Sequence, residues 1–215
     1  MKRGLSLLLI ICTLVSPSTA HAGGWGVTTL DAWPQNVVVG KPVTVTFTIR
    51  QHGVHVLTDI TPEFVFRNVS TKESLRVTAK VQPRLARFMA VLTFPSAGEW
   101  AWEMTSFPPQ RFPNLVVLET PSSAQPALDG MTLFVAKGCF MCHAHSAVLR
   151  SGEFRNGYGV GGAPALSPNK WDAEYLRTWL KDPKAIKPAT QMPNLGLRDK
   201  EIEALVTFLT AKPKP

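Results

Sequence analysis

The residues best suited to chemistry stand in one stretch, "AKGCFMCHAHS", residues 136–146. Cys139 and Cys142 are separated by two residues, and His143 follows directly. This C-x-x-C-H spacing is the attachment signal of c-type haem. In that chemistry both thiols form thioether bonds to the vinyl groups of one porphyrin. The two intervening residues let both sulfurs reach the same ring edge, and the histidine supplies an axial nitrogen to the iron.

Other interpretations of the stretch need features that the sequence lacks. A zinc site takes about four Cys, His or carboxylate ligands, whereas only His145 lies nearby and no second C-x-x-C exists. A thioredoxin-like motif sits at a βα junction of a parallel sheet, and no such pattern is visible. A structural disulfide across two residues would close a tiny loop and stabilise little. We therefore expect one covalent haem c on Cys139 and Cys142, with His143 as an axial iron ligand.

A second axial ligand is expected from the loop "PATQMPNLG", which contains Met192. Met131 falls in a helical pattern and suits packing, and Met141 is tied to the same side of the ring as the motif. His145 is the rival, and we expect it to be a solvated histidine. Met/His ligation is the pattern of electron-transfer cytochromes c, so we expect Met192 to be the axial sulfur.

The first residues read "MKRGLSLLLIICTLVSPSTAHA", with Lys2 and Arg3 before an apolar run. Ala20-His21-Ala22 fits an A-x-A cleavage site, and the apolar run at 5–15 is shorter than the roughly 20 residues that span a bilayer. We expect residues 1–22 to be a signal peptide and the mature protein to be periplasmic or otherwise exported, and soluble. Export suits covalent haem attachment, which takes place outside the bacterial cytoplasm.

The charge is modestly basic. Removing residues 1–22 lowers the formal net charge from +8 to +6, and no Lys/Arg run indicates a nucleic-acid partner. A basic rim could steer an acidic redox partner, with a solvated lysine surface as the alternative. The candidate rim residues are Lys137, Lys170, Lys181, Lys184 and Lys187. We expect no nucleic-acid partner and no small-molecule substrate.

The N-terminal half has the alternation of β-strands. "VTVTFTIR" at 43–50 alternates apolar and polar residues without a break. Six further strands are expected at 27–33, 63–69, 75–81, 87–94, 99–104 and 114–118. This spacing predicts an immunoglobulin-like β-sandwich over residues 23–119.

The pattern changes after a Pro/Ser/Ala-rich linker at 120–128. Helical periodicity predicts helices at 127–138, 172–183 and 197–212. The expected N-caps are Asp129, Asp172 and Asp199. One face of the first helix is expected to carry Met131, Phe134 and Val135. The second helix is expected to end at Pro183. Residues 129–215 are therefore expected to form an all-α domain.

Four stretches of this half, "DGMTLFVAKGCFMCH", "GGAPALSP", "TQMP" and "EIEALVTFL", together resemble the class I cytochrome c family. The resemblance covers about 85 residues. It implies a mono-haem cytochrome c fold over 129–215 and single-electron transfer. It also implies that the Pro164 carbonyl accepts the His143 Nδ1–H bond, and that Leu205 and Phe208 cross the first helix near Gly130.

The stretches "VVVGKPVTVTFTIRQHG" and "FPSAGEWAWEM" resemble YtkA-like immunoglobulin-type domains of exported bacterial proteins. A copper-binding sandwich is an alternative, with His52, His55, Met89 and Met104 as candidate ligands. A dinuclear copper centre would need two cysteines, and residues 23–120 contain none.

Taken together, these patterns predict an exported electron carrier rather than an enzyme. The sandwich would be a docking module that holds the cytochrome near another redox protein or a membrane respiratory complex, and the linker would allow reorientation. Two alternatives stay open: a haem sensor or catalyst with an open or labile sixth position, and a copper-handling module with an attached cytochrome.

Overall fold

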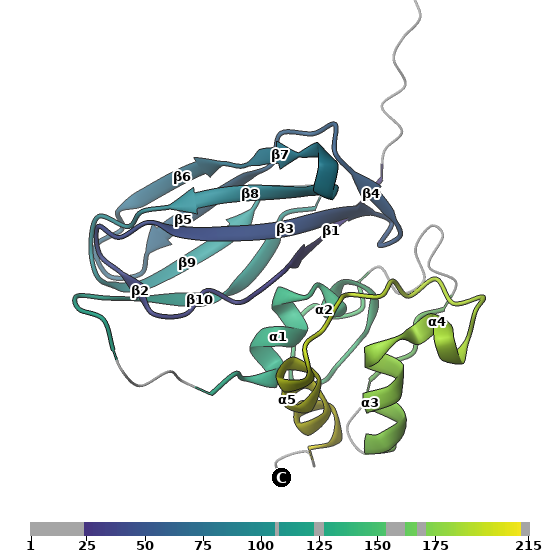
Figure 1. The fold of residues 1–215 in the computed structure, drawn as a ribbon. Helices are drawn as coiled ribbons and strands as arrows, with labels where there is room; N and C mark the ends of the chain where they lie inside the picture. The colour runs from purple at the N-terminus through teal and green to yellow at the C-terminus, as the bar shows by residue number, and fades with distance from the viewer. Residues whose placement is uncertain (1–23, 106–107, 123–126, 154–161, 167–170, 212–215) are drawn as a thin grey trace, which may run out of the picture.

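The computed structural model describes residues 24–105, 108–122, 127–153, 162–166 and 171–211. The expected signal peptide and Lys170 lie outside these residues. Along the described chain, a β-rich region comes first and a helical region follows it (Figure 1). This order confirms the expected fold class.

Two five-stranded sheets build the first region, which we call the sandwich. Its strands are β1 (Gly26–Leu30), β2 (Val37–Val38), β3 (Val43–Gln51), β4 (His55–Leu57), β5 (Glu63–Asn68), β6 (Ser74–Thr78), β7 (Lys80–Gln82), β8 (Arg87–Leu92), β9 (Gly98–Met104) and β10 (Gln110–Leu118). One sheet has the order β1-β3-β8-β7, with β4 also paired to β3, and the other has the order β2-β10-β9-β5-β6. Only the β2–β10 pair is parallel among the described strands.

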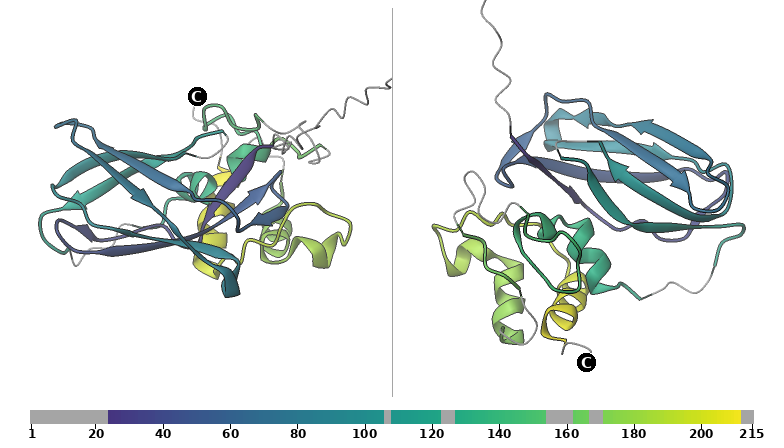
Figure 2. Two further views of the ribbon diagram at one scale, coloured as in Figure 1. Left: turned by 90° about the horizontal axis from the view of Figure 1, so that it is seen from above. Right: turned by 180° about the vertical axis from the view of Figure 1, so that it is seen from behind.

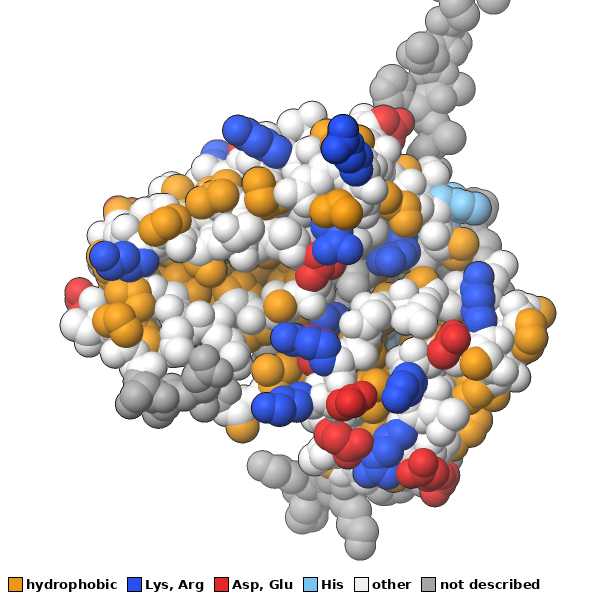
Figure 3. Space-filling view, viewed as in Figure 1, with side chains coloured by type: hydrophobic (Ala, Val, Ile, Leu, Met, Phe, Trp, Pro, Cys, Tyr) orange, Lys and Arg blue, Asp and Glu red, His pale blue; other side chains and the backbone are white. Residues whose placement is uncertain are grey.

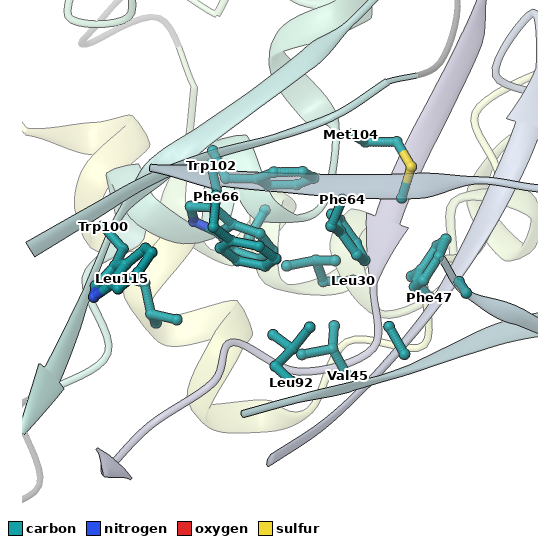
Figure 4. Packing of buried hydrophobic residues seen from close by; sticks show 14 of the residues in the cluster. Leu30, Val45, Phe47, Phe64, Phe66, Leu92, Trp100, Trp102, Met104 and Leu115 are labelled. Carbon is teal, nitrogen blue, oxygen red and sulfur yellow. The ribbon is translucent and has the colours of Figure 1, made fainter. Parts of the chain in front are cut away.

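The alternating residues predicted from the sequence face the core between the sheets. Phe47 of β3 packs edge-on against Phe64 of β5 in the other sheet, with ring centroids 5.0 Å apart. Trp102 stacks on Phe66 with ring centroids 5.2 Å apart (Figure 4). On Phe112 it stacks with centroids 4.5 Å apart. Large aromatic side chains each bury much apolar area, so this cluster contributes strongly to the hydrophobic stabilisation of the sandwich.

One expected strand, 75–81, is two strands in the structure. The chain passes from β6 in one sheet to β7 in the other at Ala79, which is buried and whose N–H donates to the Pro62 carbonyl at 2.9 Å. A small side chain fits where the two sheets meet. The alternation of residues continues through the crossing, so the sequence pattern alone does not reveal it. Strands β2 and β4 are too short for alternation to be visible.

The helices of the second region are α1 (Gly130–Ala136), α2 (Cys139–Cys142), α3 (Ala173–Lys181), α4 (Pro183–Ile186) and α5 (Asp199–Thr210). The carboxylate of Asp129 accepts a bond from Thr132 N at 2.8 Å, and that of Asp172 accepts one from Tyr175 N at 2.8 Å. Both predicted N-caps of α1 and α3 are therefore confirmed.

Other helix predictions were wrong. Arg198, rather than Asp199, is the N-cap of α5, and its N–H is bound by the Glu201 carboxylate at 2.9 Å. The prediction for Pro183 is confirmed, however: α3 stops at Lys181, with Asp182 as its C-cap directly before the proline. Pro183 also begins α4, because proline is tolerated in the first turn of a helix. Met131 does not share the buried face of α1: it is 41% exposed, because Leu133 supplies the inward contact beside Phe134.

Helices α1 and α5 cross in close contact at Gly130. A Cβ atom at Gly130 would overlap the Ala204 carbonyl oxygen and Phe208 Cβ. The predicted crossing at Phe208 is confirmed, but Ala204 rather than Leu205 is the nearest backbone. Leu205 is buried in the helical core beside this crossing.

The sandwich lies against the helices, with β1 and β10 facing α1 (Figures 1 and 2). Ala136 at the end of α1 belongs to the core of the sandwich. Trp25 and Val27 form a second apolar contact with Met141 of α2. None of the helices in the described ranges is long and apolar enough to cross a bilayer.

Candidate cofactor site

A cavity of about 780 Å³ opens among the helices and against the sandwich. Its walls come from the α1–α2 junction, α3, α5, the loops at 162–166 and 186–195, and residues of β1 and the β3–β4 turn. The volume falls in the range of about 300–1,000 Å³ that is typical of small-molecule and cofactor sites.

The two cysteines of the motif line this cavity. Gly138, with φ +76°, turns the chain from α1 into the short helix α2, which carries both thiols. Burial raises the pKa of Cys139 to about 12, with the neighbouring Cys142 adding to the shift. Burial likewise raises the pKa of Cys142 to about 11. Both thiols are protonated at neutral pH, unlike the low-pKa thiolate of a thioredoxin-type motif.

His143 lines the same cavity, and its ring is oriented by the backbone. Its Nδ1 lies 2.9 Å from the Pro164 carbonyl oxygen, which accepts the hydrogen bond. Burial lowers the pKa of His143, although the bond to Pro164 acts in the opposite direction. The imidazole is therefore neutral, with its proton on Nδ1 and a free lone pair on Nε2. The structure thus contains the His143–Pro164 contact that the resemblance implied.

Met192 is half-buried in the loop before α5 and lines the cavity. Its sulfur lies 3.0 Å from Nε1 of Trp179, which donates the bond from α3. Its backbone N–H donates to Thr190 Oγ1 at 3.2 Å. These contacts hold the thioether in the cavity that also contains the His143 ring.

The rival ligands lie elsewhere. His145 is 5% exposed and packs against the rings of Phe134 and Phe208, with centroids 5.8 and 4.4 Å away, and it is absent from the cavity wall. The expectation of a solvated His145 was wrong, because these aromatic rings cover it. Met131 is outside the cavity, and Met141 packs against the sandwich.

The described walls suit a haem, a flat apolar ring with two carboxylates. Most lining side chains are apolar, and none of those described is acidic. The cationic residues among them are Arg50, Lys137 and Lys187, and Lys137 is paired with Glu201. Nε1 of Trp171, another lining residue, is buried without a partner among the described residues. An unpaired buried donor is costly, and a carboxylate would satisfy it.

The candidate copper ligands of the sandwich do not gather in one place. Met104 is fully buried in the core, and the Met89 sulfur is 3.3 Å from Gln82 Nε2. His52 lines the cavity, whereas His55 is exposed at the start of β4. Within the described ranges, no three His, Cys, Asp or Glu side chains form a cluster that could hold a metal ion.

The expected basic rim is only partly present. Lys137 is 2% exposed, and its Nζ binds Glu201 at 2.9 Å and the Asp31 carbonyl at 2.8 Å, so its placement on the rim was wrong. Lys181, Lys184 and Lys187 are exposed. On the face seen in Figure 3, Lys and Arg side chains of the helical region are mixed with Asp and Glu.

Several cavity residues were not predicted from the sequence. Trp179 lies within the helix predicted at 172–183, and Arg50 and Gly53 belong to the sandwich. For Trp179 the sequence offered one indication of a contact with the methionine loop, namely an indole in a predicted helix thirteen positions before Met192. No local pattern connects strand β3 with the C-x-x-C-H motif.

The model of the cytochrome c family matches residues 127–211. No curated protein matches the chain. The matched residues contain α1 to α5, the C-x-x-C-H motif and Met192. The C-terminal part of this chain is therefore a helical cytochrome c domain, which implies haem-based electron transfer and follows an N-terminal all-β region of two sheets.

Proposed function

We propose that the protein is an exported mono-haem electron carrier with His143 and Met192 as axial iron ligands. The observation that carries the proposal is that one cavity contains both side chains, each fixed by a second contact. Pro164 orients the imidazole and Trp179 holds the thioether. Cys139 and Cys142 on the same wall would hold the ring covalently.

When bound, haem supplies a one-electron Fe(III)/Fe(II) couple. The protein contributes orientation: the Pro164 carbonyl keeps the proton on His143 Nδ1, which would leave Nε2 free to bind the iron. The Trp179 N–H fixes Met192 and leaves one sulfur lone pair for the metal. Ligands held in this way would change little between the two oxidation states, which would suit rapid electron transfer and would leave no open position for a substrate.

The partner proposed for this carrier is another redox protein or a membrane respiratory complex. The exposed Lys187 of the cavity wall, together with the exposed Lys181 and Lys184 close to it in the sequence, would attract an acidic docking surface. The sandwich, which we propose to be YtkA-like and immunoglobulin-type, would serve as a docking module.

Optical spectroscopy of the haem-loaded full chain tests the ligation. We expect a low-spin spectrum with the weak far-red sulfur-to-iron band, unchanged by carbon monoxide after reduction. Met192→Ala should abolish the band and allow carbon monoxide to bind. Met131→Ala is the matched control, because Met131 is exposed and outside the cavity. Wild-type protein that is high-spin or binds carbon monoxide readily would instead support a sensor or catalyst with an open iron.

A further inference from the structure

The sandwich supplies part of the cavity wall. Its contribution consists of Val27, Thr29, Arg50, His52, Gly53 and Val54. Gly53, at φ +73°, brings the β3–β4 turn close to α2. A Cβ atom on Gly53 would lie 3.6 Å from the Cys142 sulfur and 3.6 Å from the Trp25 ring. The sandwich thus reaches one of the two cysteines of the haem motif.

Contacts beside the other cysteine are equally close. A Cβ atom on Gly138, the residue before Cys139, would overlap a methyl group of Val27. Thr29 Oγ1 donates to the Lys137 carbonyl at 3.3 Å. Lys137 Nζ donates in turn to the Asp31 carbonyl at 2.8 Å. Strand β1 is therefore fixed against the segment that leads into the motif.

Arg50 places a cation in this wall. Its side chain is half-buried, and its Nη1 donates to Thr29 Oγ1 at 3.3 Å. The nearby Asp31 carboxylate is engaged by Arg87 at 2.9 Å. Burial lowers the pKa of Arg50 and Asp31 raises it, yet a guanidinium stays charged at neutral pH. Among the described lining residues no acidic side chain neutralises it.

We propose that the sandwich is a built-in wall of the haem site and that Arg50 is a positioning residue of that wall, whose positive charge raises the reduction potential. This proposal rests on the proposed function. A cation at the edge of a largely apolar cavity stabilises the state that holds one more electron, because little solvent screens it. The wall also covers the Cys142 side of the site, so the sandwich belongs to the redox centre as well as to any docking surface.

The test is a spectroelectrochemical titration of the haem-loaded full chain and three variants. Arg50→Gln removes the charge, and Arg50→Lys keeps it. Arg111→Gln is the matched control, because Arg111 is a largely exposed cation of β10 outside the cavity, paired with Glu103. We expect Arg50→Gln to lower the equilibrium constant for reduction about tenfold, which is about 59 mV for a one-electron couple.

Arg50→Lys should restore most of that loss, and Arg111→Gln should leave the potential unchanged. Circular dichroism melting checks the fold, and Arg50→Met gives a second neutral side chain if the glutamine variant does not fold. An unchanged potential in a folded neutral variant would overturn the proposal, as would an equal shift in Arg111→Gln. If the proposed ligation by His143 and Met192 is wrong, the wild-type protein will bind carbon monoxide, and this outcome is distinct from the effect of Arg50 on the potential.

Discussion

Replacing Lys137 tests the ion pair that joins α1, α5 and the sandwich. Lys137 and Glu201 are each 1% exposed at their side chains and lie 2.9 Å apart. Breaking a buried pair from one side costs about 3–5 kcal/mol, because the other charge is left uncompensated. In Lys137→Met, Glu201 keeps Arg198 as a partner at 3.1 Å. We therefore expect the free energy of unfolding to fall by the lower end of this range, about 3 kcal/mol. In Glu201→Leu the buried ammonium would retain, among the described residues, the Asp31 carbonyl alone, so we expect a loss of about 5 kcal/mol in the free energy of unfolding.

The assay is urea unfolding of the haem-loaded chain, followed by far-ultraviolet circular dichroism and by haem absorbance. The double variant Lys137→Met/Glu201→Leu should cost less than the sum of the single variants, because neither charge is left unpaired. Lys184→Met, at an exposed position of α4, is the control. A loss below about 1 kcal/mol in Lys137→Met would refute the reasoning, because it would place the ammonium in water.

Three further predictions concern the helices. Gly130→Ala should destabilise the protein by about 2–3 kcal/mol, measured by urea unfolding, because the new methyl group overlaps the Ala204 carbonyl oxygen. The Trp179 N–H bond withdraws electron density from the Met192 sulfur, and Trp179→Phe removes this bond. We therefore expect the reduction potential to fall, by at most about 40 mV, because such a hydrogen bond is worth about 1 kcal/mol. Burial opposes ionisation of Glu201, but its hydrogen bonds outweigh burial and hold its pKa below the usual range. The contribution of Glu201 to stability should therefore be complete above the unfolded pKa of about 4.3 and should disappear as the pH falls through the lower folded pKa. The measurement is the free energy of unfolding of the wild type and of Glu201→Leu between about pH 6 and 3.

Local patterns predicted most of the fold. The alternation at 43–50 predicted β3, and the carboxylates of Asp129 and Asp172 predicted two helix starts, because each depends on residues within one element. The motif and the methionine loop singled out His143 and Met192, and the structure places both side chains on the wall of one cavity. Their role as iron ligands stays a prediction.

Long-range contacts set the limit of such predictions. Lys137 looked like a surface lysine because its partners are remote; the Asp31 carbonyl is 106 residues away in the sequence. Arg50 stands at an outward-facing position of an alternating strand. Periodicity does not show whether such a side chain faces solvent or a second domain. His145 looked solvated for the same reason, since the rings that cover it come from α1 and α5.

The contact between strand β1 and Gly138 has a consequence for the order of assembly. With β1 seated there and the β3–β4 turn beside Cys142, the sandwich covers one side of the two thiols. Domains generally fold as they leave the synthesis or export machinery, N-terminal part first. The sandwich would then be folded first, and the cytochrome segment would take up its haem beside a wall that already exists.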